Sequence, residues 1–135
     1  MMIDLTGKQY RLLLDMVYIG NWILNSTRGG DRIEDYDEVE SLVFSESLKN
    51  GIKGLAEQEN DTFRPSRAYI DGGIHEAIMD YEDLTFFEIL AEELARRDMQ
   101  TEGLGQNDID ELNRRVGEYA MEFEENGLEN INVDI

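Results

Sequence analysis

The sequence contains no cysteine and only one histidine, and each shortage excludes a class of function. Without cysteine there is no disulfide framework, no thiol nucleophile and no zinc or iron–sulfur site built on thiolates. A single histidine also excludes a di-iron helical bundle, which needs a Glu/His motif on each of two helices. Any chemistry of the chain therefore rests on carboxylates, on His75 and on aromatic residues.

Basic residues are scarce as well, with 12 Lys and Arg against 31 Asp and Glu, and the formal net charge is −19. A negative field of this size repels the phosphates of nucleic acids and the head groups of anionic membranes. The charge predicts no direct nucleic-acid binding and no membrane docking. It favours solubility alone, or a partner with a basic surface.

The sequence has no apolar run long enough to cross a membrane. The longest run, residues 10–24, contains Arg11, Asp15 and Asn21, and it lacks the charged start and the small-residue cleavage site of a signal peptide. We therefore expect a cytoplasmic protein. Its 135 residues are a common size for one domain, so a single helical domain is expected over residues 1–135.

Helix signals dominate what the sequence does contain. Thr6 and Gln9 match the two ends of a capping box and predict a helix from Gly7 to about Thr27. Apolar residues are spread around nearly the whole circumference of this helix, which is typical of a helix enclosed by other elements. We expect it to be the central helix of the fold.

Four further helices are predicted from capping residues and from apolar residues at helical spacing. Their predicted starts are Asp31, Ser66, Thr85 and Asn107 or Asp108, and the last helix is expected to end at Gly127. Gly72 and Gly73 are expected to break or kink the helix that follows Ser66. Residues 52–58 are predicted to form a short amphipathic turn, and residues 60–66 a loop.

Both chain ends alternate apolar and polar residues, as Ile3 with Leu5 and Ile131 with Val133 and Ile135 show. This pattern predicts two short strands that pair with each other or with a second subunit. The predicted fold is therefore mostly α: a compact bundle of five or six helices around the first one, with a short β-ribbon formed by the two chain ends.

His75 is the centre of one candidate metal site. Asp71 precedes it by four residues and Glu82 follows it by seven, so an unbroken helix would place all three side chains on one flank. Carboxylates beside an imidazole can orient it or join it in binding a divalent cation. Solvated ion pairs are the alternative explanation, because carboxylates at helical spacing are common in so acidic a chain.

Tyr18 and Trp22 lie on one stripe of the first helix and form a candidate contact surface. Large aromatic side chains are enriched at the energetically dominant positions of protein interfaces. On so apolar a helix, Trp22 could equally be a core residue. No catalytic residue and no cofactor are predicted.

Three segments, Tyr18–Asn25, Phe86–Asp98 and Phe123–Leu128, resemble segments of small acidic helical proteins of bacteria. The resemblance implies no activity, substrate or site. From the residues themselves, we expect a non-enzymatic protein-interaction or accessory module, with a basic or apolar protein partner or as a homodimer. One alternative is a helical hydrolase that uses clustered carboxylates to bind a divalent metal, and a second is an acidic mimic of nucleic acid.

Overall fold

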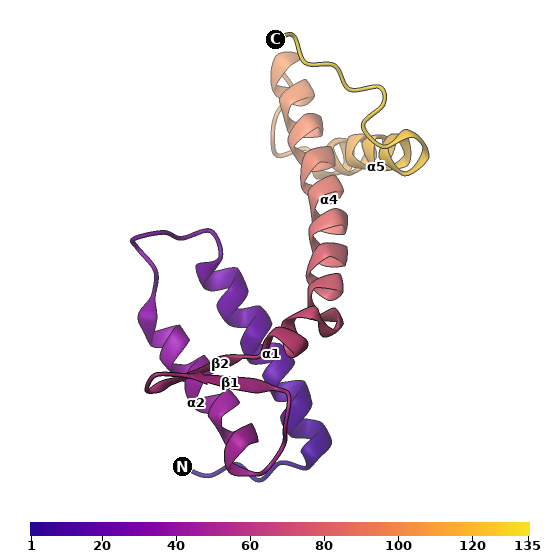
Figure 1. Cartoon of the computed structure of the whole chain (residues 1–135). Helices are drawn as coiled ribbons and strands as arrows, with labels where there is room; N and C mark the ends of the chain where they lie inside the picture. The colour runs from indigo at the N-terminus through magenta and orange to yellow at the C-terminus, as the bar shows by residue number, and fades with distance from the viewer. The chain divides into compact units, whose positions relative to one another are not determined.

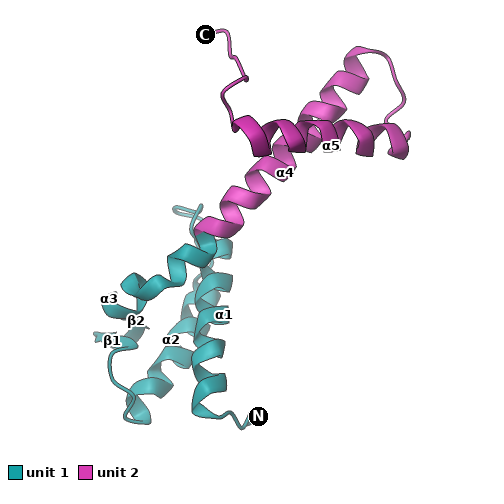
Figure 2. Cartoon of the chain, turned by 90° about the vertical axis from the view of Figure 1, so that its right-hand side faces the viewer, with its two compact units in different colours: residues 1–78 teal, residues 79–135 magenta.

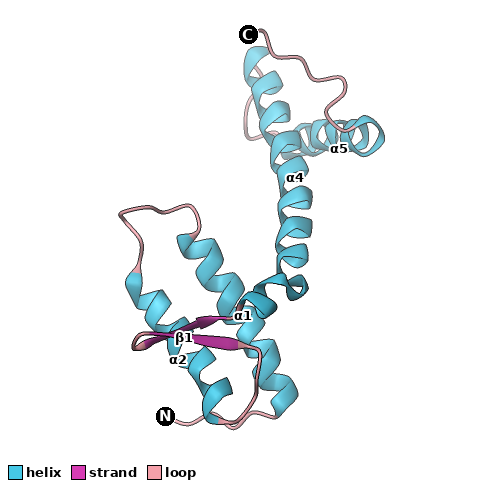
Figure 3. Cartoon of the chain, viewed as in Figure 1, coloured by secondary structure: helices cyan, strands magenta, loops and turns pink.

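The computed structural model describes residues 1–135, of which 65% are helical. The long helices are α1 (Gly7–Asn25), α2 (Glu34–Lys49), α4 (His75–Thr101) and α5 (Ile109–Asn126) (Figures 1 and 3). Between α2 and α4 lie β1 (Ala56–Glu59), β2 (Thr62–Pro65), the short α3 (Arg67–Tyr69) and a π-helical turn, η1 (Ile70–Ile74). The mostly helical class is confirmed, but four long helices and a two-stranded sheet replace the expected bundle of five or six helices.

The chain forms two compact units, residues 1–78 and 79–135, and the boundary between them falls within α4 (Figure 2). Each unit has its own hydrophobic cluster, around Leu14 and Phe44 in the first and around Met99 and Leu112 in the second. The prediction of one domain over the whole chain stays a prediction. No helix in the structure combines the length and the hydrophobicity that a membrane span requires.

In the first unit, α1 and α2 run side by side and are joined by residues 26–33 (Figure 1). The predicted capping box at Thr6 and Gln9 is present and starts α1 at Gly7. The expectation that α1 is enclosed is wrong, because Leu12, Met16 and Ile23 are exposed on it. Within the first unit, α1 packs on α2 and on residues between Leu55 and Ile78, and no further element of the unit covers its opposite side.

A β-hairpin occupies the region where the sequence predicted an amphipathic turn and a loop. Strands β1 and β2 pair antiparallel, with Glu59 opposite Thr62 across a two-residue turn. Asn60 in that turn has a positive φ of 55°, a conformation that asparagine adopts more readily than most residues. The hairpin packs on α2, where the Phe63 N–H donates to the Ser41 hydroxyl.

The predicted β-ribbon of the chain ends is not formed, because residues 1–6 and 131–135 lie outside any strand and β1 pairs only with β2. The reason is local. A hairpin closed by two residues loses little loop entropy, whereas pairing the two ends would close a loop of almost the whole chain.

The predicted cap at Ser66 and the predicted break at the glycine pair are both confirmed. The Ser66 hydroxyl accepts from the Tyr69 N–H and donates to the Gly54 carbonyl. Gly73 has a φ of 111°, which interrupts the helical backbone just before α4. The predicted helix start at Thr85 is wrong, since α4 is continuous there and the Thr85 hydroxyl donates to the Tyr81 carbonyl.

The second unit contains the C-terminal part of α4, together with α5 and the residues that follow it. Asp108 caps α5 as predicted by accepting from the Glu111 N–H, and the helix ends at Gly127, which has a φ of 56°. Ala95 and Met99 of α4 pack with Leu112 of α5 in the core of this unit.

Candidate functional site

Two buried asparagines in α1 organise the polar part of the first unit. Asn25 is 1% exposed. Its side-chain NH₂ donates to the Asn21 side-chain carbonyl and to the Ile33 backbone carbonyl, and its side-chain carbonyl accepts from the Ile33 N–H. A buried amide is tolerated only when its donors and acceptors are paired, and these are. Asn25 therefore fixes the start of α2 against the end of α1.

This contact also explains where α2 begins. The sequence predicted Asp31 as the helix cap, but the Asp31 carboxylate accepts from the Gly29 N–H within the preceding turn. Ile33 occupies the N-cap position and has no side-chain cap of its own. Asn25, eight residues away, supplies the hydrogen bonds that hold this backbone in place.

Asn21 carries the network from α1 onto α2. Its amide donates to the Asp37 carboxylate over 2.9 Å and to the Glu40 carboxylate. Asp37 is also held by two hydrogen bonds of 2.6 Å from the Arg32 guanidinium, which, with Asn21, keeps the pKa of Asp37 below its usual range. Glu40 differs, because burial raises its pKa and no basic side chain forms an ion pair with it.

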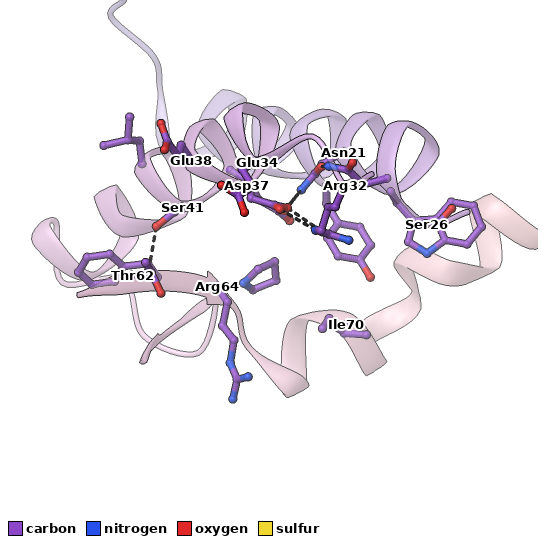
Figure 4. Close-up of a pocket in the computed structure, with 17 residues that line it drawn as sticks. Asn21, Ser26, Arg32, Glu34, Asp37, Glu38, Ser41, Thr62, Arg64 and Ile70 are labelled. Atoms are coloured by element: carbon purple, nitrogen blue, oxygen red, sulfur yellow. Dashed lines mark hydrogen bonds and ion pairs between the residues drawn. The ribbon is translucent and has the colours of Figure 1, made fainter. Parts of the chain in front are cut away.

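These side chains line a groove of about 920 Å³ between α1, α2 and β2, which we call the polar groove (Figure 4). Aromatic rings and carboxylates share its walls. The residues that matter for its chemistry are Tyr18, Trp22, Glu34, Asp37, Glu38, Glu40 and Phe63. Figure 4 shows Arg32 turned toward Asp37 and Asn21, whereas Arg64 points out of the groove, where it pairs with Glu57 and Glu59.

Tyr18 and Trp22, the candidate contact residues, both line the polar groove, and both rings lie edge-on to the His75 ring. The Tyr18 hydroxyl and His75 Nε2 are 2.6 Å apart and form a hydrogen bond. Burial raises the pKa of Tyr18, as does the charge of Glu40, which keeps the phenol protonated at neutral pH. The pair therefore acts as a structural contact and orients both rings at the groove.

A second tyrosine, Tyr69, holds Tyr18 in place. The Tyr69 ring lies edge-on to Tyr18 and to Phe44, and its hydroxyl donates to the Asp15 carboxylate over 2.7 Å. Burial and the Asp15 carboxylate both raise the pKa of Tyr69. Tyr69 thus fixes the position of Tyr18 in the core.

The three candidate metal ligands have different surroundings. His75 contacts Tyr18, Asp71 forms a 2.9 Å ion pair with Arg67, and Glu82 belongs to the second unit. No group of three or more His, Asp or Glu side chains is placed to hold a metal ion. The metal site on Asp71, His75 and Glu82 stays a prediction from the sequence.

Comparison with known protein families, with curated proteins and with solved structures finds no match.

Sequence reasoning missed the residues that build the groove, above all Asn21, Asn25 and Glu40. A signal for the first two was present: two asparagines four residues apart inside a helix rich in apolar residues are costly unless they bond to each other or to the backbone. Glu40 carried no such signal, because α2 contains many carboxylates and only the packed structure shows which one is shielded from water.

Proposed function

We propose that this chain is a protein-interaction module whose polar groove receives a basic segment of a partner protein. The observation that carries the proposal is the uncompensated negative charge of the groove. Glu34, Glu38 and Glu40 line it, and none of them forms an ion pair with a basic side chain of the chain. Of the two arginines at the groove, Arg32 is paired with Asp37 and Arg64 with Glu57 and Glu59.

Glu40 is the strongest single attraction for a cation. Its carboxylate is partly shielded from water, and its only hydrogen bond in the structure comes from the Asn21 amide. A partner's Lys or Arg would supply the missing positive charge where the dielectric constant is lower than in bulk water. The ionised form of Glu40 would then be stabilised in the complex.

The aromatic rings of the groove favour the same partner chemistry. Trp22 and Tyr18 lie beside the carboxylates and are held in place by His75. Tryptophan and tyrosine faces attract Lys and Arg through cation–π interactions, and their rings also pack on the apolar stems of these side chains. In a segment that alternates basic and apolar residues, the basic side chains would pair with the carboxylates and the apolar ones would pack on the aromatic rings.

Strand addition to β2 is excluded as the mode of contact. Across a two-residue turn, alternate residues of β2 direct their N–H groups away from β1, and these residues are Phe63 and Pro65. The Phe63 N–H already donates to Ser41, and proline has no N–H to offer. A partner in the polar groove must therefore bind through side chains rather than by adding a strand to β2.

Trp22 is the only tryptophan, so its fluorescence reports directly on the groove. We expect an arginine-rich peptide with interleaved apolar residues to cause a saturable change in Trp22 emission, and an acidic peptide of the same length to cause none. Glu40→Gln should weaken binding at least about threefold, the effect of losing one partly shielded ion pair.

Glu76→Gln provides a matched control, because Glu76 is exposed on α4 and does not line the groove. It removes the same unit of charge from the chain as Glu40→Gln does. Equal weakening by both variants would mean that only the net charge attracts the peptide, and it would refute a specific site. Equal binding of the basic and the acidic peptide would refute the proposal as well.

A further inference from the structure

The polar groove already holds one guanidinium, which belongs to the chain itself. Arg32 lines the groove, and its Nε and Nη2 each donate to a different oxygen of the Asp37 carboxylate over 2.6 Å (Figure 4). Two such bonds are the geometry in which arginine recognises a carboxylate, and lysine cannot form them in this way, because its ammonium is a single point of charge. The cation that fits Asp37 is therefore a guanidinium.

Asp37 is also held in place by a residue other than Arg32. The Asn21 amide donates to Asp37 Oδ1 over 2.9 Å, and Asn21 is itself buried and accepts a hydrogen bond from Asn25. This contact ties the carboxylate to α1 whether or not an arginine is bound. A group that is ordered before its ligand arrives loses less conformational entropy on binding. Asp37 thus forms a preorganised site for a guanidinium, whichever chain supplies it.

The ion pair between Arg32 and Asp37 is exposed enough to exchange. The two side chains are 47% and 34% exposed, and ion pairs at such positions contribute little to stability. The backbone beside Arg32 does not depend on this pair, because the Asn25 side chain holds Ile33, the next residue, by two hydrogen bonds. The Arg32 side chain can therefore leave Asp37 without releasing the start of α2.

Arg32 also limits the negative charge that the groove offers to a partner. It is the one basic side chain turned toward the carboxylates of the groove, since Arg64 points outward and pairs elsewhere. Its charge reaches Glu40 as well: burial raises the pKa of Glu40, and the Asn21 hydrogen bond and the charge of Arg32 oppose that rise. Displacing Arg32 would leave these carboxylates to the cations of the partner alone.

We propose that Arg32 is an internal competitor of the partner: its guanidinium occupies the Asp37 site, and an arginine of the partner segment takes its place on binding. The inference rests on the proposed function and deepens it, because it names arginine rather than lysine as the residue recognised at Asp37. A partner lysine would break the two bonds from Arg32 and could not replace both. The exchange therefore selects against lysine.

The test compares the unmodified chain with Arg32→Ala and with a matched control, Arg28→Ala. Each variant removes one positive charge from the segment between α1 and α2, but Arg28 pairs with Asp31 and does not line the groove. Trp22 emission follows titration with two peptides, in which leucine alternates with arginine or with lysine. We expect Arg32→Ala to bind the arginine peptide at least about twofold more tightly than Arg28→Ala does, the effect of removing one exposed competing ion pair.

The ratio of the affinities for the arginine and lysine peptides separates the Asp37 site from net charge. It should be larger in Arg32→Ala than in the unmodified chain, unchanged in Arg28→Ala, and intermediate in Arg32→Lys, which keeps the charge but not the two bonds. An unchanged ratio in Arg32→Ala, or binding of the arginine peptide no tighter than by Arg28→Ala, would overturn the inference while specific binding of basic peptides still supports the proposed function. If no chain binds either peptide, both are refuted.

Discussion

At the scale of single residues, the polar groove depends on side chains that are expensive to bury. Asn21 and Asn25 are nearly inaccessible to water, and every hydrogen-bonding group of their side chains has a partner. Glu40 is the exception to this balance, because one amide hydrogen bond is a weak substitute for the hydration of a carboxylate. Residues kept at a cost to stability are typical of binding sites.

This cost predicts how Glu40→Gln affects stability. Burial raises the pKa of Glu40 above its ordinary 4.5, so the folded chain binds this proton more tightly than the unfolded chain does. The free energy of unfolding contributed by this group is therefore highest below pH 4.5 and falls as the pH rises through the raised pKa. Glutamine keeps an acceptor for Asn21 without the charge.

We expect Glu40→Gln to raise the melting temperature by a few degrees near pH 7 and to leave it nearly unchanged below pH 4.5. Thermal unfolding followed by circular dichroism at both pH values measures this. Glu38→Gln removes the same charge from an exposed position on the same helix and should have little effect at either pH. A Glu40→Gln chain that is less stable than the unmodified one near pH 7 would contradict the explanation.

At the scale of the elements, the break before α4 rests on one glycine of a pair. Gly73 has a φ of 111°, which residues with a side chain rarely adopt, whereas Gly72 has no positive φ. Neither position has another atom near enough to obstruct a methyl group. The two glycines therefore differ in backbone conformation alone.

Substituting each glycine by alanine should have opposite effects. We expect Gly73→Ala to lower the free energy of unfolding by about 1–3 kcal/mol, because alanine is strained at this φ. Gly72→Ala should raise it by about 0.4–1 kcal/mol by restricting the unfolded chain. Urea denaturation of both variants provides the comparison. Similar effects of the two substitutions would show that the kink does not depend on the φ of Gly73.

The sequence predicted those parts of the elements that local chemistry decides. The caps at Thr6, Ser66 and Asp108 and the break at Gly73 all depend on hydrogen bonds or backbone angles within a few residues. The hairpin was missed because β1 reads Ala-Glu-Gln-Glu, without alternation, and its stability comes from packing on α2. The predicted helix start at Thr85 failed because a threonine inside a continuous helix can bond to the preceding turn, as the Thr85 hydroxyl does with the Tyr81 carbonyl.

The candidate site was less accessible to sequence reasoning than the elements. Tyr18 and Trp22 were identified as surface candidates, and both reach the groove, but their contact with His75 joins residues more than fifty positions apart. No local pattern indicates such a contact. The same holds for Asn21 and Glu40, whose pairing depends on how α2 packs against α1.

At the scale of the whole molecule, charge is divided unequally along the chain. Residues 79–135 contain 17 of the 31 acidic residues and four of the 12 basic ones. All four of these arginines already form ion pairs within the unit. The second unit therefore contributes most of the net negative charge of the chain.

The two hydrophobic clusters predict how stability is distributed. Phe44 is 0% exposed in the first unit, and Met99 is 0% exposed in the second. Replacing either by alanine leaves a cavity that costs about 2–5 kcal/mol. Because the clusters share no residue, we expect Phe44→Ala to lower the protection of backbone amides from hydrogen exchange within residues 1–78. Met99→Ala should do so within residues 79–135.

Hydrogen exchange followed by mass spectrometry measures both effects in the full chain, and each variant serves as the control for the other. Peptides wholly within one unit are the informative ones, because α4 contains the boundary between the units. Loss of protection in both units from either substitution would show one cooperative domain over residues 1–135, as the sequence predicted. Loss confined to the unit that carries the substitution would show instead that a continuous helix can join two units whose stabilities are set separately.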